Sequence, residues 1–182
     1  MLLLAPNHAL AQYLLGAVYL LTNRAVEGIA KCEHALALDP NVASAHNMIG
    51  TAKLFTGRAE ETESHVLEAL RLSPRDTDAH RWMALAAFAK LYLGRDEEAV
   101  AWYRRAIETN RNHSVAHFFL AAALAQLGRM SEARSATEAG LALDPTFTIR
   151  RFRASASSDN PTYLAQRARI FDALRNAGVP EG

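Results

Sequence analysis

Apolar side chains recur at the spacing of an α-helix through most of the chain, and the alternation of apolar and polar residues that would predict strands is absent. The pattern is clearest between residues 41 and 74, where two amphipathic segments flank a turn at Gly57-Arg58 and Pro74 closes the second. The apolar residues of the two segments are Ile49, Ala52, Leu54 and Phe55, then Val66, Leu67, Leu70 and Leu72. We therefore predict two helices joined by a tight turn.

The same unit recurs along the chain. Pro6, Pro40 and Pro74 lie 34 residues apart, and Pro145 follows Pro74 by 71 residues, which leaves room for one further unit that closes at Arg111. Self-similarity at such a period predicts a helical repeat array, in which each unit buries its apolar face against its neighbours.

Each predicted turn carries residues suited to ending one helix and starting the next. The turns are Asn23-Arg24, Gly57-Arg58, Gly94-Arg95 and Gly128-Arg129, and three residues after each Arg come Glu27, Glu61, Glu98 and Glu132. Glycine or asparagine can adopt the left-handed conformation that ends a helix. A carboxylate in the first turn of a helix meets the positive end of the helix dipole. We interpret these charged residues as helix-start chemistry and not as a catalytic set.

The motif Leu15-Gly16-x-x-Tyr19, followed by Gly28, Cys32, Ala35 and Pro40, resembles the tetratricopeptide repeat, and about 140 residues share its spacing. The resemblance implies an all-α, right-handed solenoid of antiparallel helix pairs with a C-terminal capping helix. It implies a single domain over residues 1–182. Within it the four repeats cover residues 9–42, 43–76, 77–113 and 114–147. The end of a truncated repeat at 1–8 precedes them, and a degenerate repeat and capping helix at 148–182 follow.

Two places depart from the regular period. Met1–Pro6 aligns with the closing segments of the later repeats, which suggests a piece of a longer protein or a late start site; the alternative is a short apolar segment that caps the stack. The third repeat has three extra residues, which we expect between His80 and Gly94 in its first helix, placing Tyr92 on a protruding end. That end is equally compatible with a tolerated insertion and with a shaped groove wall.

The last 37 residues lose the period. Ile149 and Phe152 indicate a shortened helix, and Asn160 followed by Pro161 predicts the start of a helix that ends near Ala177. This helix is expected to cover the open apolar side of the last repeat. The whole tail resembles the C-terminal end of bacterial class III adenylate or guanylate cyclases that carry a tetratricopeptide array, which implies a regulatory or scaffolding arm whose catalytic domain is not in this chain.

The charge and hydrophobicity of the chain limit the classes of partner that it is expected to bind. The formal net charge is +1, with −2 over residues 1–145 and +3 over the tail, so no strong field attracts nucleic acid, and the tail arginines lack aromatic stacking neighbours. The single Cys32 permits no intrachain disulfide, and no apolar run is long enough to span a bilayer. We expect a cytoplasmic protein that does not act at membranes. Apolar surface at its N-terminal end would allow a homo-oligomer.

Catalytic and metal chemistry are not expected. His46, His80 and His117 occupy the same place in successive repeats, too far apart to share one ion, and His113 and His117 keep only a small residual metal prospect. No phosphate-binding loop or nucleophile elbow occurs, and Cys32 occupies a packing position. We predict no catalytic residues, no metal and no cofactor.

What remains is a binding surface. In the repeat family that the chain resembles, the first helix of each repeat lines the concave face, and the residues carried over to that face are Tyr13, Asn47, Thr51, Arg81, Phe88, Tyr92, Phe118, Ala122 and Gln126. Aromatic side chains with an amide, a hydroxyl and an arginine are typical of protein interfaces. Phe88 and Phe118 are equally compatible with ordinary packing between helices. We predict a non-catalytic scaffold that binds a peptide or partner domain here; the alternative is the regulatory region of a cyclase.

Overall fold

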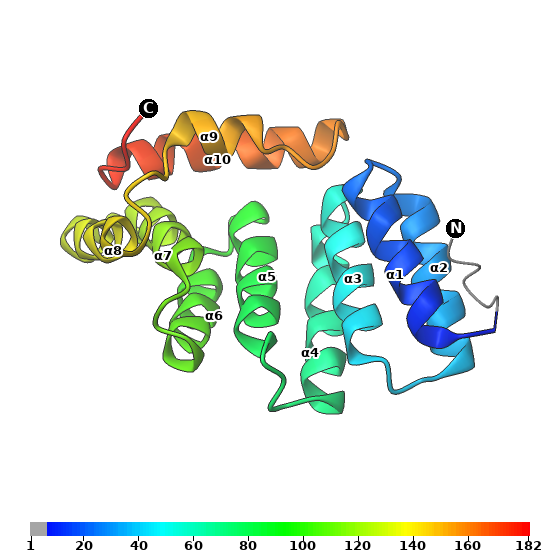
Figure 1. The fold of residues 1–182 in the computed structure, drawn as a ribbon. Coiled ribbons are helices and arrows are strands. Elements are labelled where there is room, and N and C mark those ends of the chain that lie inside the picture. Colours follow the sequence, from blue (N-terminus) through cyan, green and yellow to red (C-terminus); the bar gives the residue numbers. More distant parts are fainter. Residues whose placement is uncertain (1–6) are drawn as a thin grey trace.

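The computed structural model describes residues 7–182, which form ten α-helices, one short 3-10 helix and no strand. Met1–Pro6, and with it most of the expected truncated repeat, lies outside the described residues. The helices are α1 (Ala9–Leu21), α2 (Ala25–Leu38), α3 (Ala43–Phe55), η1 (Ala59–Glu61), α4 (Thr62–Leu72), α5 (Ala79–Tyr92), α6 (Asp96–Thr109), α7 (Ser114–Gln126), α8 (Met130–Leu143), α9 (Ile149–Ala154) and α10 (Pro161–Asn176). The predicted all-α stack of helix pairs is confirmed (Figure 1).

The first eight α-helices form four successive pairs, and each pair turns at the residue expected to end its first helix. Asn23, Gly57, Gly94 and Gly128 have φ of 59°, 78°, 73° and 73°, which is the left-handed region. Beyond the turn, Arg24 donates to Glu27 at 3.0 Å and Arg129 donates to Glu132 at 2.8 Å. These contacts join the turn to the first turn of the second helix, where the sequence predicts the glutamates to lie.

The helices of a pair approach closely where the sequence places small residues. A Cβ on Gly16 would lie 2.6 Å from the Cys32 sulfur, and a Cβ on Gly140 would lie 2.8 Å from the Phe118 ring. Ala69 and Ala106 are fully buried in the second and third pairs. A larger residue at these crossings would therefore separate the helices.

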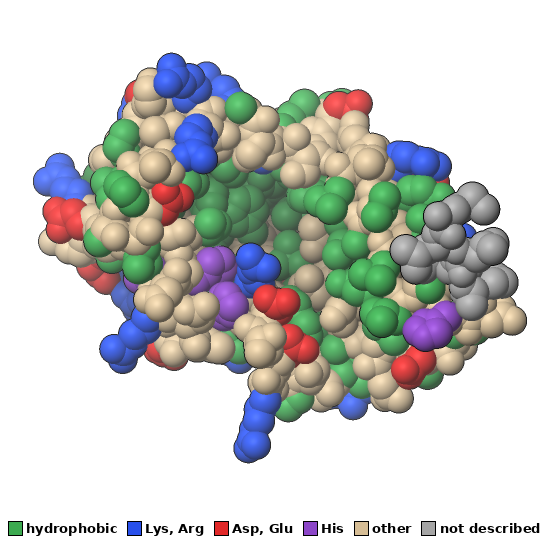
Figure 2. Space-filling model, in the orientation of Figure 1, with side chains coloured by type: hydrophobic (Ala, Val, Ile, Leu, Met, Phe, Trp, Pro, Cys, Tyr) green, Lys and Arg blue, Asp and Glu red, His purple; other side chains and the backbone are tan. Residues whose placement is uncertain are grey.

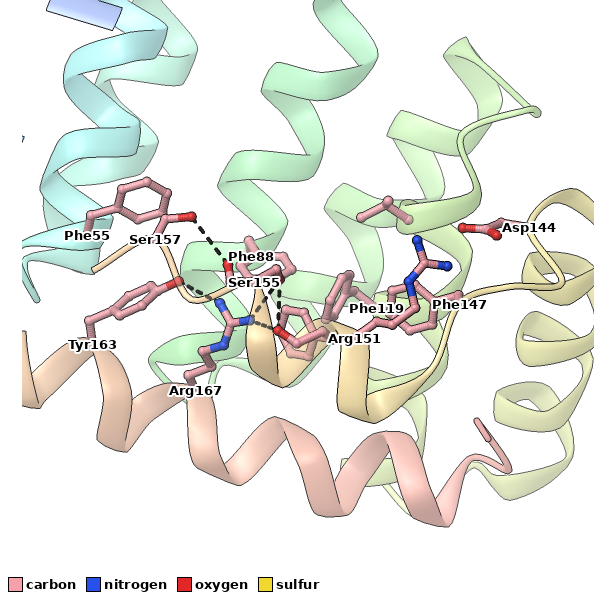
Figure 3. A pocket seen from close by; sticks show the side chains of 12 residues that line it. Phe55, Phe88, Phe119, Asp144, Phe147, Arg151, Ser155, Ser157, Tyr163 and Arg167 are labelled. Carbon is pink, nitrogen blue, oxygen red and sulfur yellow. Dashed lines mark hydrogen bonds between the residues drawn. The ribbon is translucent and has the colours of Figure 1, made fainter. Parts of the chain in front are cut away.

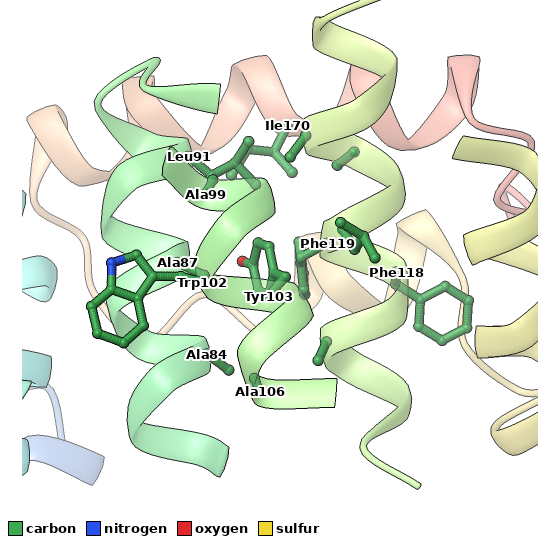
Figure 4. Close-up of a cluster of buried hydrophobic side chains, with 14 of the residues drawn as sticks. Ala84, Ala87, Leu91, Ala99, Trp102, Tyr103, Ala106, Phe118, Phe119 and Ile170 are labelled. Atoms are coloured by element: carbon green, nitrogen blue, oxygen red, sulfur yellow. The ribbon is translucent and has the colours of Figure 1, made fainter. Parts of the chain in front are cut away.

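The described core has two parts of unequal size. A small cluster between α2 and α3 contains Cys32, Ala35, Ala45 and Ile49. A much larger cluster runs from α3 and α4 through α8 to α10. Figure 4 shows its centre, where Tyr103 and Phe119 lie between α5, α6 and α7, and Ile170 of α10 approaches Leu91. The C-terminal helix thus shares the core of the repeats.

The extra length of the third repeat lies mainly in a connection, contrary to the prediction. The link between α4 and α5 covers residues 73–78, two residues more than the link 39–42 between α2 and α3, while α5 has 14 residues against 13 in α3. Tyr92 does not protrude. It is 2% exposed, because its ring packs 5.6 Å from the ring of Tyr163 in α10.

The C-terminal segment, residues 144–182, covers more than the last helix pair. Figure 1 shows α9 and α10 lying across the ends of the preceding helices. Asn160 caps α10 by accepting a hydrogen bond from the Tyr163 backbone N–H, as predicted. From there α10 runs from the α3–α4 turn, where a Cβ on Gly57 would touch Thr162, to α8, where the Thr137 hydroxyl donates to the Ala177 carbonyl at 2.9 Å.

Candidate functional site: an aromatic pocket beneath the C-terminal segment

A cavity of about 400 Å³ opens where the first helices of the pairs face the C-terminal segment. We call it the aromatic pocket, and its lining is Phe55, Phe88, Val115, Phe119, Asp144, Phe147, Arg151, Phe152, Ser155, Ser157, Tyr163 and Arg167. Figure 3 shows these side chains converging from α3, α5 and α7 on one side and from α9 and α10 on the other. Figure 2 shows a hollow with hydrophobic side chains in it on the same face of the molecule.

Edge-to-face ring contacts build the floor of the pocket. Phe88 of α5 and Phe119 of α7 have centroids 4.3 Å apart, and the Phe152 ring of α9 lies 4.9 Å from Phe119. Such arrangements are the favourable ones for aromatic rings. Since each ring comes from a different helix, the stacking of the repeats and the docking of α9 position the floor together.

One end of the pocket is open to solvent and lined by charged side chains. Arg151 lies on the exposed side of α9 and donates to the Thr146 carbonyl at 2.7 Å. Hydrogen bonds from Thr146 lower the pKa of Asp144, and the positive charge of Arg151 lowers it further. The Asp144 carboxylate therefore stays ionised beside the aromatic floor at neutral pH.

Arg167 forms the opposite wall as a buried cation. It is 3% exposed, and its guanidinium donates to the Tyr163 hydroxyl at 2.7 Å, to the Phe152 carbonyl and to the Ser155 hydroxyl. The same group lies 4.0 Å above the Phe152 ring. Within residues 7–182 no carboxylate lies within ion-pair distance of it. The Phe152 carbonyl at the C-terminal end of α9 and the face of the Phe152 ring stabilise its charge instead.

The nine groove residues predicted from sequence are distributed over several environments. Phe88 is partly exposed and lines the aromatic pocket. Tyr92, Phe118 and Ala122 are buried, and Gln126 donates to the Arg169 carbonyl of α10 at 3.2 Å. The other four lie outside the pocket on α1, α3 and α5: Tyr13, Asn47, Thr51 and Arg81.

Sequence reasoning missed most of the pocket. Phe119 was not assigned to the binding face, and Phe147, Phe152, Tyr163 and Arg167 belong to the tail, where the repeat period gives no guide. The available signal was compositional, because aromatic and arginine residues are interleaved from residue 147 to residue 171. That mixture is enriched at binding surfaces. The expectation that the tail arginines lack aromatic stacking neighbours was wrong, since the Arg153 guanidinium lies 4.7 Å from the centre of the Phe171 ring.

Four of the histidines lie in two ring pairs, His46 with His65 and His80 with His113. The rings of His80 and His113 lie 4.9 Å apart, and Asn110 is 3.1 Å from His80. Burial lowers the pKa of His113 to about 4, with further lowering by the neighbouring His80 and Arg81. Across the described residues there is no group of three or more His, Cys, Asp or Glu side chains placed to hold a metal ion.

Cys32 has the environment of a packing residue. Its side chain is fully buried, and burial raises the pKa of its thiol to about 12. The pocket lining contains neither histidine nor cysteine. The arrangement can accommodate an apolar group with polar atoms at its edge.

Four successive helix pairs followed by a C-terminal segment define an α-solenoid of helical repeats. Residues 47–114 match the model of the family described as tetratricopeptide repeat. No α-helix among the described residues is long and apolar enough to cross a membrane.

Solved structures share the fold over most of the chain. YrrB, described as a tetratricopeptide repeat protein with an unusual peptide-binding site, is 21% identical, with 95% of this chain and 86% of that chain covered at a TM-score of 0.64. The pilF protein of Pseudomonas aeruginosa is 19% identical, with coverages of 92% and 78% and a TM-score of 0.72. MamA is 15% identical, with coverages of 92% and 87% and a TM-score of 0.66. A comparison with curated proteins found no match.

Proposed function

We propose that this chain is a non-catalytic protein-interaction module that binds a peptide segment by taking one bulky apolar side chain into the aromatic pocket. The observation that carries the proposal is the pocket itself: a space of about 400 Å³ floored by Phe88, Phe119 and Phe152 and open to solvent beside charged groups. An apolar recess with a few fixed polar groups is the usual form of a binding site.

The size of the pocket favours a side chain over a whole domain. Burying a Leu, Met or Phe side chain contributes about 1.5–3 kcal/mol, so one anchor in the pocket would supply a large part of the affinity of a short peptide. Arg151 and Asp144 at the edge offer a donor and an acceptor to the peptide backbone. The peptide-binding site named for YrrB supports a peptide as the class of partner.

We further propose that a longer partner continues from the pocket over the first helices of the preceding pairs. Arg81 is exposed, and Tyr13, Asn47 and Thr51 are partly exposed, so these predicted groove residues remain available for polar contacts. This extension would contribute less than the pocket, because none of the four lies in an enclosed apolar site.

A peptide library displayed on phage tests the pocket directly. We expect selection on the full chain to enrich peptides that share one large apolar or aromatic residue. Val115→Asp places a charge at the pocket edge, where Val115 is 40% exposed, and should weaken the selected peptides at least tenfold in fluorescence anisotropy. Leu67→Asp is the matched control, because Leu67 is 50% exposed on α4 and does not line the pocket.

Two results would overturn the proposal: selection that enriches no peptide family, or selected peptides that bind the Val115→Asp and wild-type chains equally. A charge at the mouth should strongly disfavour an apolar anchor, so retained affinity would place the binding surface elsewhere.

The alternative hypothesis, that the chain is the regulatory region of a cyclase, has a separate test. We propose that residues 1–182 turn over neither ATP nor GTP, with or without added Mg²⁺ or Mn²⁺. Formation of a cyclic nucleotide by the purified chain would contradict the non-catalytic assignment and favour an enzyme.

A further inference from the structure

The first helix presents an apolar stripe to solvent. Leu10, Leu14, Val18 and Leu21 of α1 are 51%, 48%, 53% and 85% exposed. Their spacing of three or four residues places them on one side of the helix. Among the described α-helices only α1 and α7 contain no Asp, Glu, Lys or Arg, and α7 is largely buried in the stack. Figure 2 shows hydrophobic side chains over the part of the surface that Figure 1 assigns to α1.

The later helix pairs show what normally covers this stripe. Leu14 of α1 and Phe119 of α7 hold equivalent places, each two residues before the small residue of a helix crossing, Gly16 or Ala121. Phe119 is 2% exposed because it packs on Phe88 and Tyr103 of the preceding pair.

The position two residues after the small residue of the crossing is also buried in the later first helices and exposed in α1. Ala52, Ala89 and Ala123 hold this place in α3, α5 and α7 and are 1%, 1% and 0% exposed, whereas Val18 in α1 is 53% exposed. The middle of the stripe, Leu14 and Val18, thus corresponds to positions that the later first helices bury fully or in part, whereas the position of Leu10 is exposed in α5 and α7, at Arg81 and Val115.

The opposite end of the stack cannot supply that surface from a second copy. The exposed face of α8, the last helix of the four pairs, carries the charged residues Glu132, Arg134 and Glu138. Head-to-tail stacking of copies would take these charges out of water. Another α1 has the required chemistry, because two uncharged stripes can meet without desolvating a charge.

We propose that the chain forms an isologous dimer in which the α1 stripes of two copies pack on each other. Because the same patch is used twice, the contact closes at two subunits and does not extend into a filament. One helix stripe is smaller than the interface of a permanent dimer, so the complex should dissociate at about micromolar concentration.

Sedimentation velocity over about 1 to 100 µM tests the dimer on the full chain. We expect a monomer–dimer equilibrium that Val18→Glu shifts to monomer by at least tenfold in the dissociation constant. Leu67→Glu, an equally exposed apolar residue of α4, should leave the equilibrium unchanged. Circular dichroism establishes that each variant keeps its helices.

A charge-complementation experiment gives an independent readout. Leu14→Glu and Leu14→Lys chains should each be monomeric, and their mixture should recover the dimer because opposite charges then face each other across the interface. A wild-type chain that stays monomeric at the highest concentration, a dimer unaffected by Val18→Glu, or oligomers that grow beyond two subunits would each overturn the proposal.

Discussion

Lys90 shows how a single charged residue can join three helices. Its ammonium lies on α5, is nearly buried, and contacts Glu63 of α4 at 2.7 Å and Glu98 of α6 at 2.6 Å. Glu63 also accepts from the Trp102 indole N–H at 2.9 Å. Burial acts to raise the pKa of Glu63, but the hydrogen bonds from Lys90 and Trp102 outweigh it, so the pKa is lowered.

We expect Glu63→Gln to reduce the free energy of unfolding by roughly 1–2 kcal/mol at pH 7, since Lys90 loses one partner but keeps the other and Glu63 is partly exposed. A lowered folded-state pKa stabilises the fold above the ordinary value of 4.5, and this stabilisation is lost as the pH falls through the lowered value. The difference between wild type and variant in urea unfolding should therefore shrink toward pH 3. Glu60→Gln, a change at an exposed neighbour, should have little effect at either pH.

At the scale of elements, α10 acts as a strap that ties the pairs together. Its Tyr163 ring lies 5.4 Å from Phe55 of α3 and 5.6 Å from Tyr92 of α5. Farther along, Arg169 donates to both carboxylate oxygens of Asp96 at 3.0 and 3.1 Å. The strap also holds Arg167 and thereby one wall of the aromatic pocket, so pocket shape depends on α10.

Tyr163→Ala should be among the most destabilising substitutions in the tail, at about 3–5 kcal/mol, because it leaves a cavity among buried rings. The neighbouring Leu164→Ala should cost under about 1 kcal/mol, because Leu164 is 41% exposed. Urea denaturation of the two variants measures the difference. Similar losses from both would mean that α10 is only loosely docked.

Across the whole molecule the packing is uneven. The large core cluster spans α3 to α10, while the first pair contributes only to the small cluster around Cys32. In a stack of repeats, stability is the sum of local terms and contacts between neighbours. The first pair has a neighbour on one side only within the described chain, so it should open more readily than the rest.

Cys32 reports that opening, because a buried thiol with a pKa of about 12 reacts only when the pair exposes it. The test uses pH 8 and a concentration at which the chain is monomeric. Under these conditions a thiol reagent should modify Cys32 at a rate higher than the rate of global unfolding. Tyr163→Ala should not change the rate, since local opening of the first pair does not involve α10. A rate that rises in proportion to the global destabilisation would show that the stack opens only as one unit.

The local features of the fold could be predicted because they depend on neighbours in sequence. The turns at Gly57, Gly94 and Gly128 and the cap at Asn160 follow from backbone preferences and short-range hydrogen bonds. The placement of the three extra residues was wrong, since spacing between two landmarks does not distinguish a longer helix from a longer connection.

By itself the sequence determined the helix pairs and their turns, because a 34-residue period repeats the same short-range physics in every unit. Only the tertiary structure decided where α9 and α10 dock, and hence that Phe88, Phe119 and Phe152 meet in a pocket while Tyr92 and Phe118 are buried. The physical reason is that this docking joins residues tens of positions apart through side-chain shape. A period describes repeated neighbours and carries no information about a segment that does not repeat.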